Sequence, residues 1–132
     1  MSTPGSETPP PVAGLEREAL EHVWDQDGAE VTVREVLDAL NGGGGKQRAY
    51  TTLMTVLSRL HRKGLLERRR DGRTDLYRAA LTREEFLQAR AREEVDALVG
   101  AYGDAALVQF ARRVSEQDPS VRARLRRLAR RD

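Results

Sequence analysis

A group of hydroxyl and guanidinium side chains between residues 50 and 63 is the part of this sequence best suited to binding a ligand. On a helix that turns about 100° per residue they share one side: Thr51, Thr55, Ser58, Arg59 and Arg62. Threonine is a mediocre helix former, so its concentration there needs another reason. Threonine can hydrogen-bond to a base edge or touch a thymine methyl, and arginine can bind phosphate or guanine. This face therefore predicts contact with double-stranded DNA.

The charge distribution indicates the same ligand. Residues 46–78 hold ten Lys and Arg against three Asp and Glu, although the formal net charge of the whole chain is only +2. A dense positive segment attracts a polyanion, because phosphates that are neutralised release their counterions. The alternative is an ordinary basic face exposed to solvent.

Three predicted helices must position the threonine and arginine face. Apolar residues recur at helical spacing over residues 15–24 and 33–40, and again within 50–63. Thr32 followed by Glu35 is a capping-box pattern that predicts the start of the second helix. We expect Asn41 and Gly42 to end that helix, residues 42–45 to form a flexible connection, and Gly64 to end the third helix.

A β-hairpin is predicted directly after the third helix. Residues 65–70 and 74–78 have the pattern of two short strands, and Asp71 and Gly72 favour a tight turn between them. Three helices followed by a basic hairpin are the winged helix-turn-helix arrangement, in which the third helix enters the major groove and the hairpin, or wing, rests on the neighbouring backbone. Besides the threonines, the predicted DNA contacts are cationic: Arg59, Arg62, Lys63, Arg69, Arg70 and Arg73.

The remainder of the chain is predicted to be helical. Thr82 and Glu85 form a second capping box, and Asp118 followed by Pro119 predicts the start of a last helix. A helical segment of about 50 residues buries its apolar faces poorly by itself, so a second copy of the chain is expected to cover them in a homodimer. The side chains expected at the dimer contact lie on apolar stripes: Val95, Leu98, Val99, Tyr102, Leu107, Phe110, Val114, Val121, Leu125 and Leu128.

These elements define the expected organisation of the chain. The fold class is mainly α with a small β-hairpin wing: a winged helix-turn-helix domain over residues 15–80 and a C-terminal helical dimerisation domain over residues 81–132. The proline-rich segment 1–14 is expected to be a disordered tail.

Composition excludes several classes of function. The absence of cysteine and the presence of only two histidines argue against disulfides and metal sites, and no cofactor is expected. Residues 1–12 lack the basic and apolar regions of a secretory signal, and there is no apolar run of the roughly 20 residues that membrane insertion needs, so a cytoplasmic protein is expected. No catalytic constellation can be argued, which predicts a protein that is not an enzyme. An alternative to a DNA-binding repressor is a winged-helix module that binds an acidic protein without operator specificity.

Three motifs carry a resemblance to a known family. The stretches AYTTLMTVLSRL (residues 49–60), RKG (62–64) and GRTDLY (72–77) resemble the penicillinase-repressor family of winged-helix transcriptional repressors, BlaI/MecI/CopY. The resemblance covers about residues 15–114. It implies a repressor that binds a short palindromic operator as a homodimer. It also implies that Thr51, Thr52 and Thr55 face the bases and that Arg59 faces phosphate.

The resemblance further implies a mode of release from DNA. In antibiotic-responsive members of the family, a membrane sensor with a zinc protease domain triggers cleavage in the dimerisation helices, commonly at an Asn-Phe bond. This chain has Gln109-Phe110 in a similar context, with glutamine in place of asparagine. The family's copper-responsive branch binds metal through C-terminal cysteines, which are absent here. Proteolysis after a cell-wall antibiotic signal and binding of a small ligand are both open as the inducing event.

Overall fold

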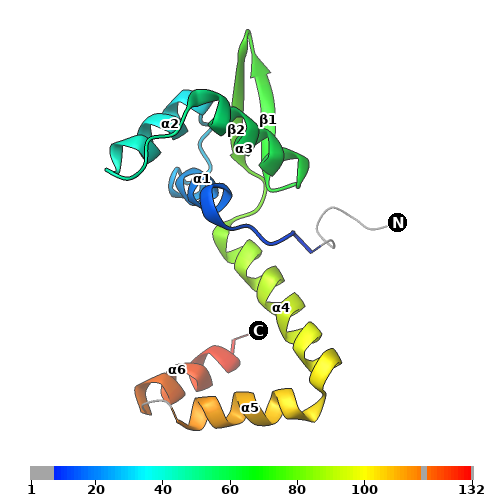
Figure 1. The fold of residues 1–132 in the computed structure, drawn as a ribbon. Helices are drawn as coiled ribbons and strands as arrows, with labels where there is room; N and C mark the ends of the chain where they lie inside the picture. The colour runs from blue at the N-terminus through cyan, green and yellow to red at the C-terminus, as the bar shows by residue number, and fades with distance from the viewer. Residues whose placement is uncertain (1–7, 117–118, 132) are drawn as a thin grey trace. The chain divides into compact units, whose positions relative to one another are not determined.

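The computed structural model describes residues 8–116 and 119–131, which fall into two compact units that divide between Ala91 and Arg92. The fold class is mainly α with one two-stranded antiparallel hairpin, as predicted. The elements are α1 (Gly14–Asp25), α2 (Val33–Gly42), α3 (Tyr50–Arg62), β1 (Leu66–Asp71), β2 (Thr74–Ala79), α4 (Arg83–Tyr102), α5 (Asp104–Ser115) and α6 (Pro119–Ala129) (Figure 1).

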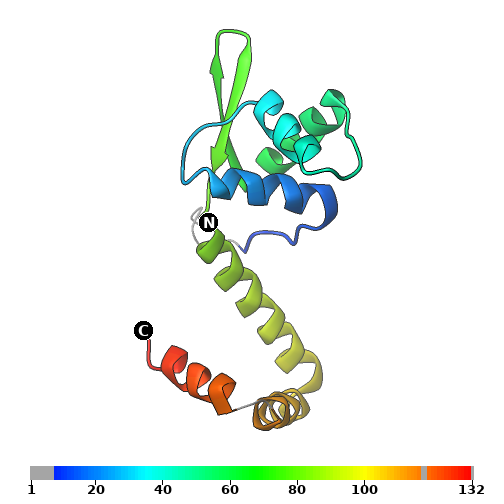
Figure 2. The same cartoon turned by 90° about the vertical axis from the view of Figure 1, so that its left-hand side faces the viewer.

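The core of the first unit lies between α1, α2 and α3, which gather beside the base of the hairpin (Figure 1 and Figure 2). Leu20 from α1, Val36 from α2 and Leu57 from α3 are completely buried there. Val31 also forms an isolated antiparallel bridge with Tyr77 of β2, whose two hydrogen bonds measure 2.7 and 2.8 Å. The segment between α1 and α2 is thereby attached to the wing.

The predicted helix boundaries hold with one exception. Both halves of the capping box at α2 form, because the Glu35 N–H donates to Thr32 Oγ1 at 3.1 Å and the Thr32 N–H donates to Glu35 Oε1 at 2.8 Å. α2 ends at Gly42, as predicted from Asn41 and Gly42, but the connection predicted over residues 42–45 begins one residue later, at Gly43. The Asn41 side chain accepts from the Arg48 N–H at 2.9 Å and donates to the Arg48 carbonyl at 3.1 Å, which closes the glycine-rich loop.

The hairpin has a tight turn as predicted, but the turn consists of residues 72 and 73, because Asp71 belongs to β1 and not to the turn. Asp71 pairs with Thr74, and Gly72 between them has φ 63°, a conformation that glycine adopts without steric cost. The register continues through Arg70 opposite Asp75 and Arg68 opposite Tyr77. Because residues directly opposite each other share a face of a hairpin, Arg68 and Arg70 lie on one face and Arg69 lies on the other.

The first unit extends through Ala91, beyond the boundary that the sequence predicts at residue 80. The capping box at Thr82 and Glu85 forms as predicted, and it starts α4 against α1. Phe86 is buried in the core, where its ring centroid lies 5.4 Å from that of Trp24. The Trp24 Nε1–H donates to the Leu81 carbonyl at 2.9 Å. The first turn of α4 therefore completes the winged-helix core.

The described part of the N-terminal segment also differs from its prediction as a disordered tail to residue 14. Residues 1–7 lie outside the described residues. Pro9 is buried and Val12 packs against the core, so the segment from residue 8 onward covers the first unit. Arg90 Nη1 donates to the Pro9 carbonyl at 3.3 Å, which supplies a polar contact that composition alone does not predict.

The second unit exposes most of its large apolar side chains. Val95, Leu98, Val99 and Tyr102 of α4 are exposed, as are Leu107 and Phe110 of α5 and Val121 and Leu128 of α6. Val114 and Leu125 are half-buried. The predicted cap at Asp118 lies outside the described residues. None of the helices in the described part of the chain has the length and apolar character that a membrane span requires.

The role of α4 in the winged-helix core can be measured. Phe86→Ala removes a fully packed ring, so it should lower the free energy of unfolding by about 3–5 kcal/mol. Leu87→Ala changes the neighbouring side chain, which is 41% exposed, and should change stability by only about 0.5 kcal/mol. Chemical denaturation of the full chain measures both. Equal effects of the two substitutions would show that α4 does not belong to this core.

Candidate nucleic-acid interface

The outward face of α3 carries a short row of polar side chains. Leu53, Val56, Leu57 and Leu60 are buried on the opposite side of the helix, and this burial sets which residues point outward. Thr51, Thr55 and Arg62 are exposed on the outward face, and Ser58 is half-buried. Thr55 Oγ1 donates to the Thr51 carbonyl at 3.1 Å, so the lone pairs of its hydroxyl oxygen stay available to an external donor.

The flank of α3 that faces α1 holds two of the predicted DNA contacts. Lys63 Nζ lies 2.6 Å from Glu16 Oε1, and Arg59 Nη1 lies 3.6 Å from Glu16 Oε2. The Glu16 side chain is only 13% exposed, whereas that of Arg59 is 49% exposed. Lys63 is thus committed to an internal ion pair, and Arg59 has the freedom to reach an external anion. Thr52 is exposed on the side of α3 nearer to this flank.

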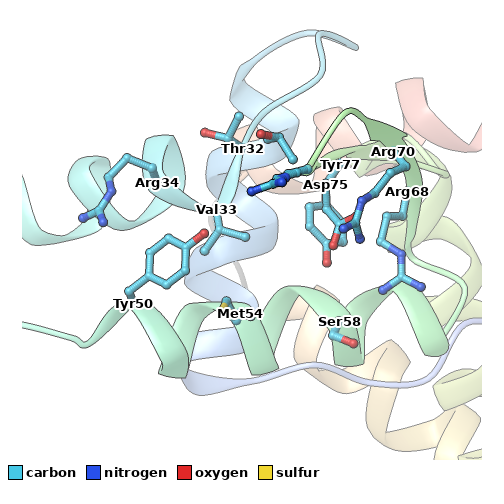
Figure 3. Close-up of a pocket in the computed structure, with 12 residues that line it drawn as sticks. Thr32, Val33, Arg34, Tyr50, Met54, Ser58, Arg68, Arg70, Asp75 and Tyr77 are labelled. Carbon is cyan, nitrogen blue, oxygen red and sulfur yellow. The ribbon is translucent and has the colours of Figure 1, made fainter.

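A groove runs between the other flank of α3 and the wing, and four arginines line it: Arg34, Arg68, Arg70 and Arg73. Figure 3 shows Tyr50, Met54 and Ser58 along α3 on the side that faces Arg68 and Arg70 of the hairpin. The guanidinium carbon of Arg34 lies 4.9 Å from the centre of the Tyr50 ring. The groove is therefore positively charged on both sides and partly apolar along α3.

The groove includes two arginines that sequence reasoning did not select. Arg68 belongs to it because the period of two along β1 places its side chain on the same face as Arg70. That alternation is visible in the sequence and could have identified Arg68. Arg34 comes from the first turn of α2, and only the packing of α2 against α3 brings it to this groove. No salt bridge involves Arg34, Arg68 or Arg73 within the described residues.

Arg69 lies on the other face of the wing. Its Nε and Nη2 donate to the two carboxylate oxygens of Glu30 at 2.9 and 2.8 Å. Hydrogen bonding to Arg69 holds the pKa of Glu30 below its usual value, and the same pair raises the pKa of Arg69. The structure thus places this predicted DNA contact away from the groove, with its hydrogen-bonding fork occupied by a carboxylate. Arg70 lies on the groove face, with Nη1 3.4 Å from Asp75 Oδ1.

The second unit offers a different kind of surface. Leu98 and Tyr102 of α4 and Ala106 and Phe110 of α5 line an apolar groove. Gln109, of the predicted cleavage bond, lines the same groove. Tyr102 and Phe110 are 66% and 62% exposed, which is unusual for aromatic side chains without a partner surface. Within the described residues, no group of three or more acidic or histidine side chains could hold a metal ion.

Comparison with known proteins identifies the family. A sequence model described as penicillinase repressor matches residues 12–131, which is most of the chain. The protein belongs to the penicillinase repressor family. A relative in this family, the transcriptional regulator BlaI of Mycobacterium tuberculosis strain H37Rv, is 39% identical over 108 residues, which cover 79% of this chain and 74% of that protein. The resemblance predicted from the α3 and wing motifs is therefore confirmed.

Two solved structures are similar to this penicillinase repressor. The complex structure of hsRosR-S1 has a TM-score of 0.51 and 16% identity, and the match covers 89% of this chain and 88% of that chain. The solution structure of monomeric Bacillus licheniformis BlaI in complex with the blaP half-operator has a TM-score of 0.46 and 23% identity over 58% of this chain and 89% of that chain. Family membership supports the coarser functional prediction, a DNA-binding transcriptional repressor rather than an enzyme.

The two faces of the wing should differ in their contact with DNA. Arg68→Ala and Arg69→Ala each remove one positive charge from β1, so they form a matched pair. Arg68→Ala should reduce the slope of log K against log salt by about 1 unit, because it removes a phosphate contact. Arg69→Ala should leave the slope nearly unchanged, since its guanidinium binds Glu30. Titrations of one duplex at several salt concentrations measure both slopes. A larger change of slope in Arg69→Ala than in Arg68→Ala would show that DNA contacts the face of the wing that carries Arg69.

Proposed function

We propose that this penicillinase repressor binds a palindromic operator as a homodimer, with one α3 helix in each of two half-sites. The observation that carries the proposal is the polar face of α3, where Thr51, Thr55 and Arg62 point outward beside a groove lined by arginines. A major groove admits a helix of this kind, and each base pair presents a distinct pattern of donors and acceptors there.

The outward face of α3 would contact the base edges. The Thr55 hydroxyl already donates within the helix, so it would act as an acceptor toward the amino group of adenine or cytosine. Its methyl group can also touch a thymine methyl. Arg62 lies near the end of α3, where its guanidinium donates to Ser58 Oγ at 3.2 Å and would turn toward guanine or phosphate. Thr51 and Thr52 extend the face toward the start of the helix.

The arginine-lined groove would hold the DNA backbone beside α3. Arg34, Arg68 and Arg73 have no salt-bridge partner within the described residues, so binding phosphate would not require them to leave a carboxylate. Arg70 would exchange its long 3.4 Å contact with Asp75 for a phosphate. On the opposite flank of α3, Arg59 would contact phosphate while Lys63 stays paired with Glu16.

A second copy of the chain would cover the apolar surface of α4, α5 and α6. Exposed side chains such as Leu98, Tyr102 and Phe110 would lose contact with water there, which favours association. Two linked DNA-binding units engage two half-sites together, so the second contact forms at a high effective concentration. Dimerisation therefore supplies affinity that one wing and one α3 cannot.

Release by proteolysis is the inducing event that we propose, with a membrane sensor protease acting after a cell-wall antibiotic signal. It rests on the resemblance of the segment around Gln109 and Phe110 to the family's cleavage region. This bond lies inside α5, so a protease needs that helix to unwind locally. Cleavage would separate α6 and part of α5 from the rest of the chain, and the dimer contact would lose Phe110 from its apolar surface.

Base contact by α3 can be tested at Thr55 on an operator located by genomic footprinting. Thr55→Ala improves helix propensity, and it should weaken operator binding by about 1–3 kcal/mol while hardly affecting random duplex. Thr55→Ser keeps the hydroxyl and should retain most of the discrimination. Competition binding at one salt concentration measures the ratio. Unchanged discrimination in Thr55→Ala would exclude this face from base contact, and no preference for any duplex in the unsubstituted protein would favour a protein-binding module.

The dimer contact can be tested at Phe110. The unsubstituted protein should have twice the 14.8 kDa mass of one chain in solution. Phe110→Glu puts a charge into the proposed contact and should shift the mass to that of the monomer, because burying an unpaired charge is costly. Val108→Glu makes the same kind of change on another side of α5 and should leave the dimer intact. Light scattering measures the masses, and a dimeric Phe110→Glu protein would show that the contact lies elsewhere.

A further inference from the structure

The polar face of the last helix, α6, consists almost entirely of arginine. Residues 119–131 contain six arginines and no Asp or Glu, and the nearest acids in the sequence are Asp118 and Asp132. All six are exposed, four within α6 and two directly after it: Arg122, Arg124, Arg126, Arg127, Arg130 and Arg131. At about 100° per residue, the four within the helix spread over roughly 200° of its circumference. Val121, Leu125 and Leu128 form a separate apolar stripe on the remaining side.

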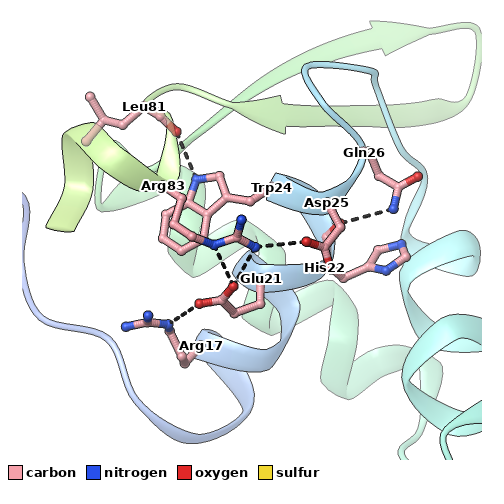
Figure 4. A network of polar contacts seen from close by, with 8 residues as sticks. All are labelled: Arg17, Glu21, His22, Trp24, Asp25, Gln26, Leu81 and Arg83. Atoms are coloured by element: carbon pink, nitrogen blue, oxygen red, sulfur yellow. Dashed lines mark hydrogen bonds and ion pairs between the residues drawn. The ribbon is translucent and has the colours of Figure 1, made fainter. Parts of the chain in front are cut away.

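The arginines of α6 differ from many arginines elsewhere in the chain, which bind a carboxylate. Arg83 and Arg17 both donate to Glu21, at 2.6 and 2.8 Å, and the three side chains lie together in Figure 4. In α5, Arg113 lies 3.6 Å from Glu116. Within the described residues, none of the six arginines in 119–131 forms a salt bridge. Most of the arginines that line the groove beside α3 share this property. Binding phosphate would not require the α6 arginines to leave any carboxylate that the structure describes.

The arginine face is unfavourable for the helix that contains it. Arg122 and Arg126 are four residues apart, and Arg124 and Arg127 are three residues apart, so like charges are neighbours on the helix surface and repel each other. The helix dipole favours only the cations of the last turn. α6 has no acidic residue in its first turn, whereas α4 and α5 both do. Helix stability therefore gives little reason for this arrangement. A polyanion would remove the repulsion.

The charge density of α6 is close to that of double-stranded DNA. At about 1.5 Å per residue, the four arginines from 122 to 127 give one positive charge per roughly 2 Å of helix, and a duplex carries one negative charge per about 1.7 Å. Guanidinium groups also fit phosphate oxygens with two parallel hydrogen bonds. A helix that lies in a membrane surface typically buries bulky side chains such as Trp and Phe. α6 has no aromatic residue, and Leu125 of its apolar stripe is half-buried in the protein. These features favour a duplex over a lipid surface.

We propose that α6 is a second DNA-binding surface, which contacts the phosphates of a duplex without reading its bases. This surface goes beyond operator recognition by α3 and does not depend on it, because phosphate contacts form on any sequence. The arginines and the apolar stripe occupy different sides of α6, so phosphate binding is compatible with the proposed dimer contact. Sequence-independent contacts of this kind let a repressor stay on DNA while it moves between operators.

Salt titrations of the full chain with a random-sequence duplex test this inference. A double variant, Arg122→Gln with Arg126→Gln, removes two charges from α6 and keeps its apolar stripe and helix propensity. It should reduce the slope of log K against log salt by about 2 units, since each phosphate contact contributes about 0.9. The matched control, Arg92→Gln with Arg112→Gln, removes two charges from exposed residues of the same unit outside α6 and should hardly change the slope. Light scattering should give both variants the mass of the unsubstituted protein.

Hydrogen exchange of the full chain locates the contact. Backbone amides of residues 119–131 should exchange more slowly with excess random duplex, and this protection should disappear at about 1 M salt and in the α6 double variant. Vesicles of phosphatidylglycerol and phosphatidylcholine should give no protection. Equal slopes in the two double variants would overturn the proposal, because total charge would then explain the effect. Protection by vesicles but not by duplex would overturn it in favour of a membrane surface, and protection by neither would leave an ordinary solvated face. Operator discrimination is measured separately through Thr55→Ala, so either claim can fail alone.

Discussion

Burial of one side of α3 is the constraint on which the rest of this interface depends. Leu53, Leu57 and Leu60 are completely buried against α1 and α2, so α3 cannot rotate about its axis without exposing them. The fixed rotation leaves Thr51 and Thr55 pointing outward. It also directs one flank of α3 toward Glu16 and the other toward the wing. Apolar packing therefore decides which polar side chains can meet a duplex.

Internal carboxylates then divide the cations of the basic segment into two classes. Glu16 binds Lys63 and Glu30 binds Arg69. These two cations still add positive charge to the segment, but their side-chain donors are already bound to a carboxylate. Arg68 and Arg73 have no such partner within the described residues, and they line the groove beside α3. Net charge alone thus overstates the number of cations that are free of a carboxylate partner. Which cations are available depends on acids that lie far away in the sequence.

Local patterns predicted the elements well, because capping boxes, turn glycines and apolar spacing act over a few residues. Thr32 with Glu35 and Gly72 at the wing turn are examples. Long-range features could not be predicted in this way. The pairing of Lys63 with Glu16 and the placement of Arg34 in the groove depend on how the helices pack. Burial of Phe86, which extends the first unit into α4, has the same origin.

Selection of DNA from a random duplex library tests the central claim most directly, because the operator sequence does not have to be known to carry it out. If α3 contacts base edges in two half-sites, successive rounds at physiological salt should enrich an inverted repeat with a fixed spacing between its halves. The Thr55→Ala protein should enrich the same repeat less strongly. A library that stays random after selection, while the protein still binds it in a salt-dependent manner, would contradict the account, because affinity would then come from phosphate contacts alone.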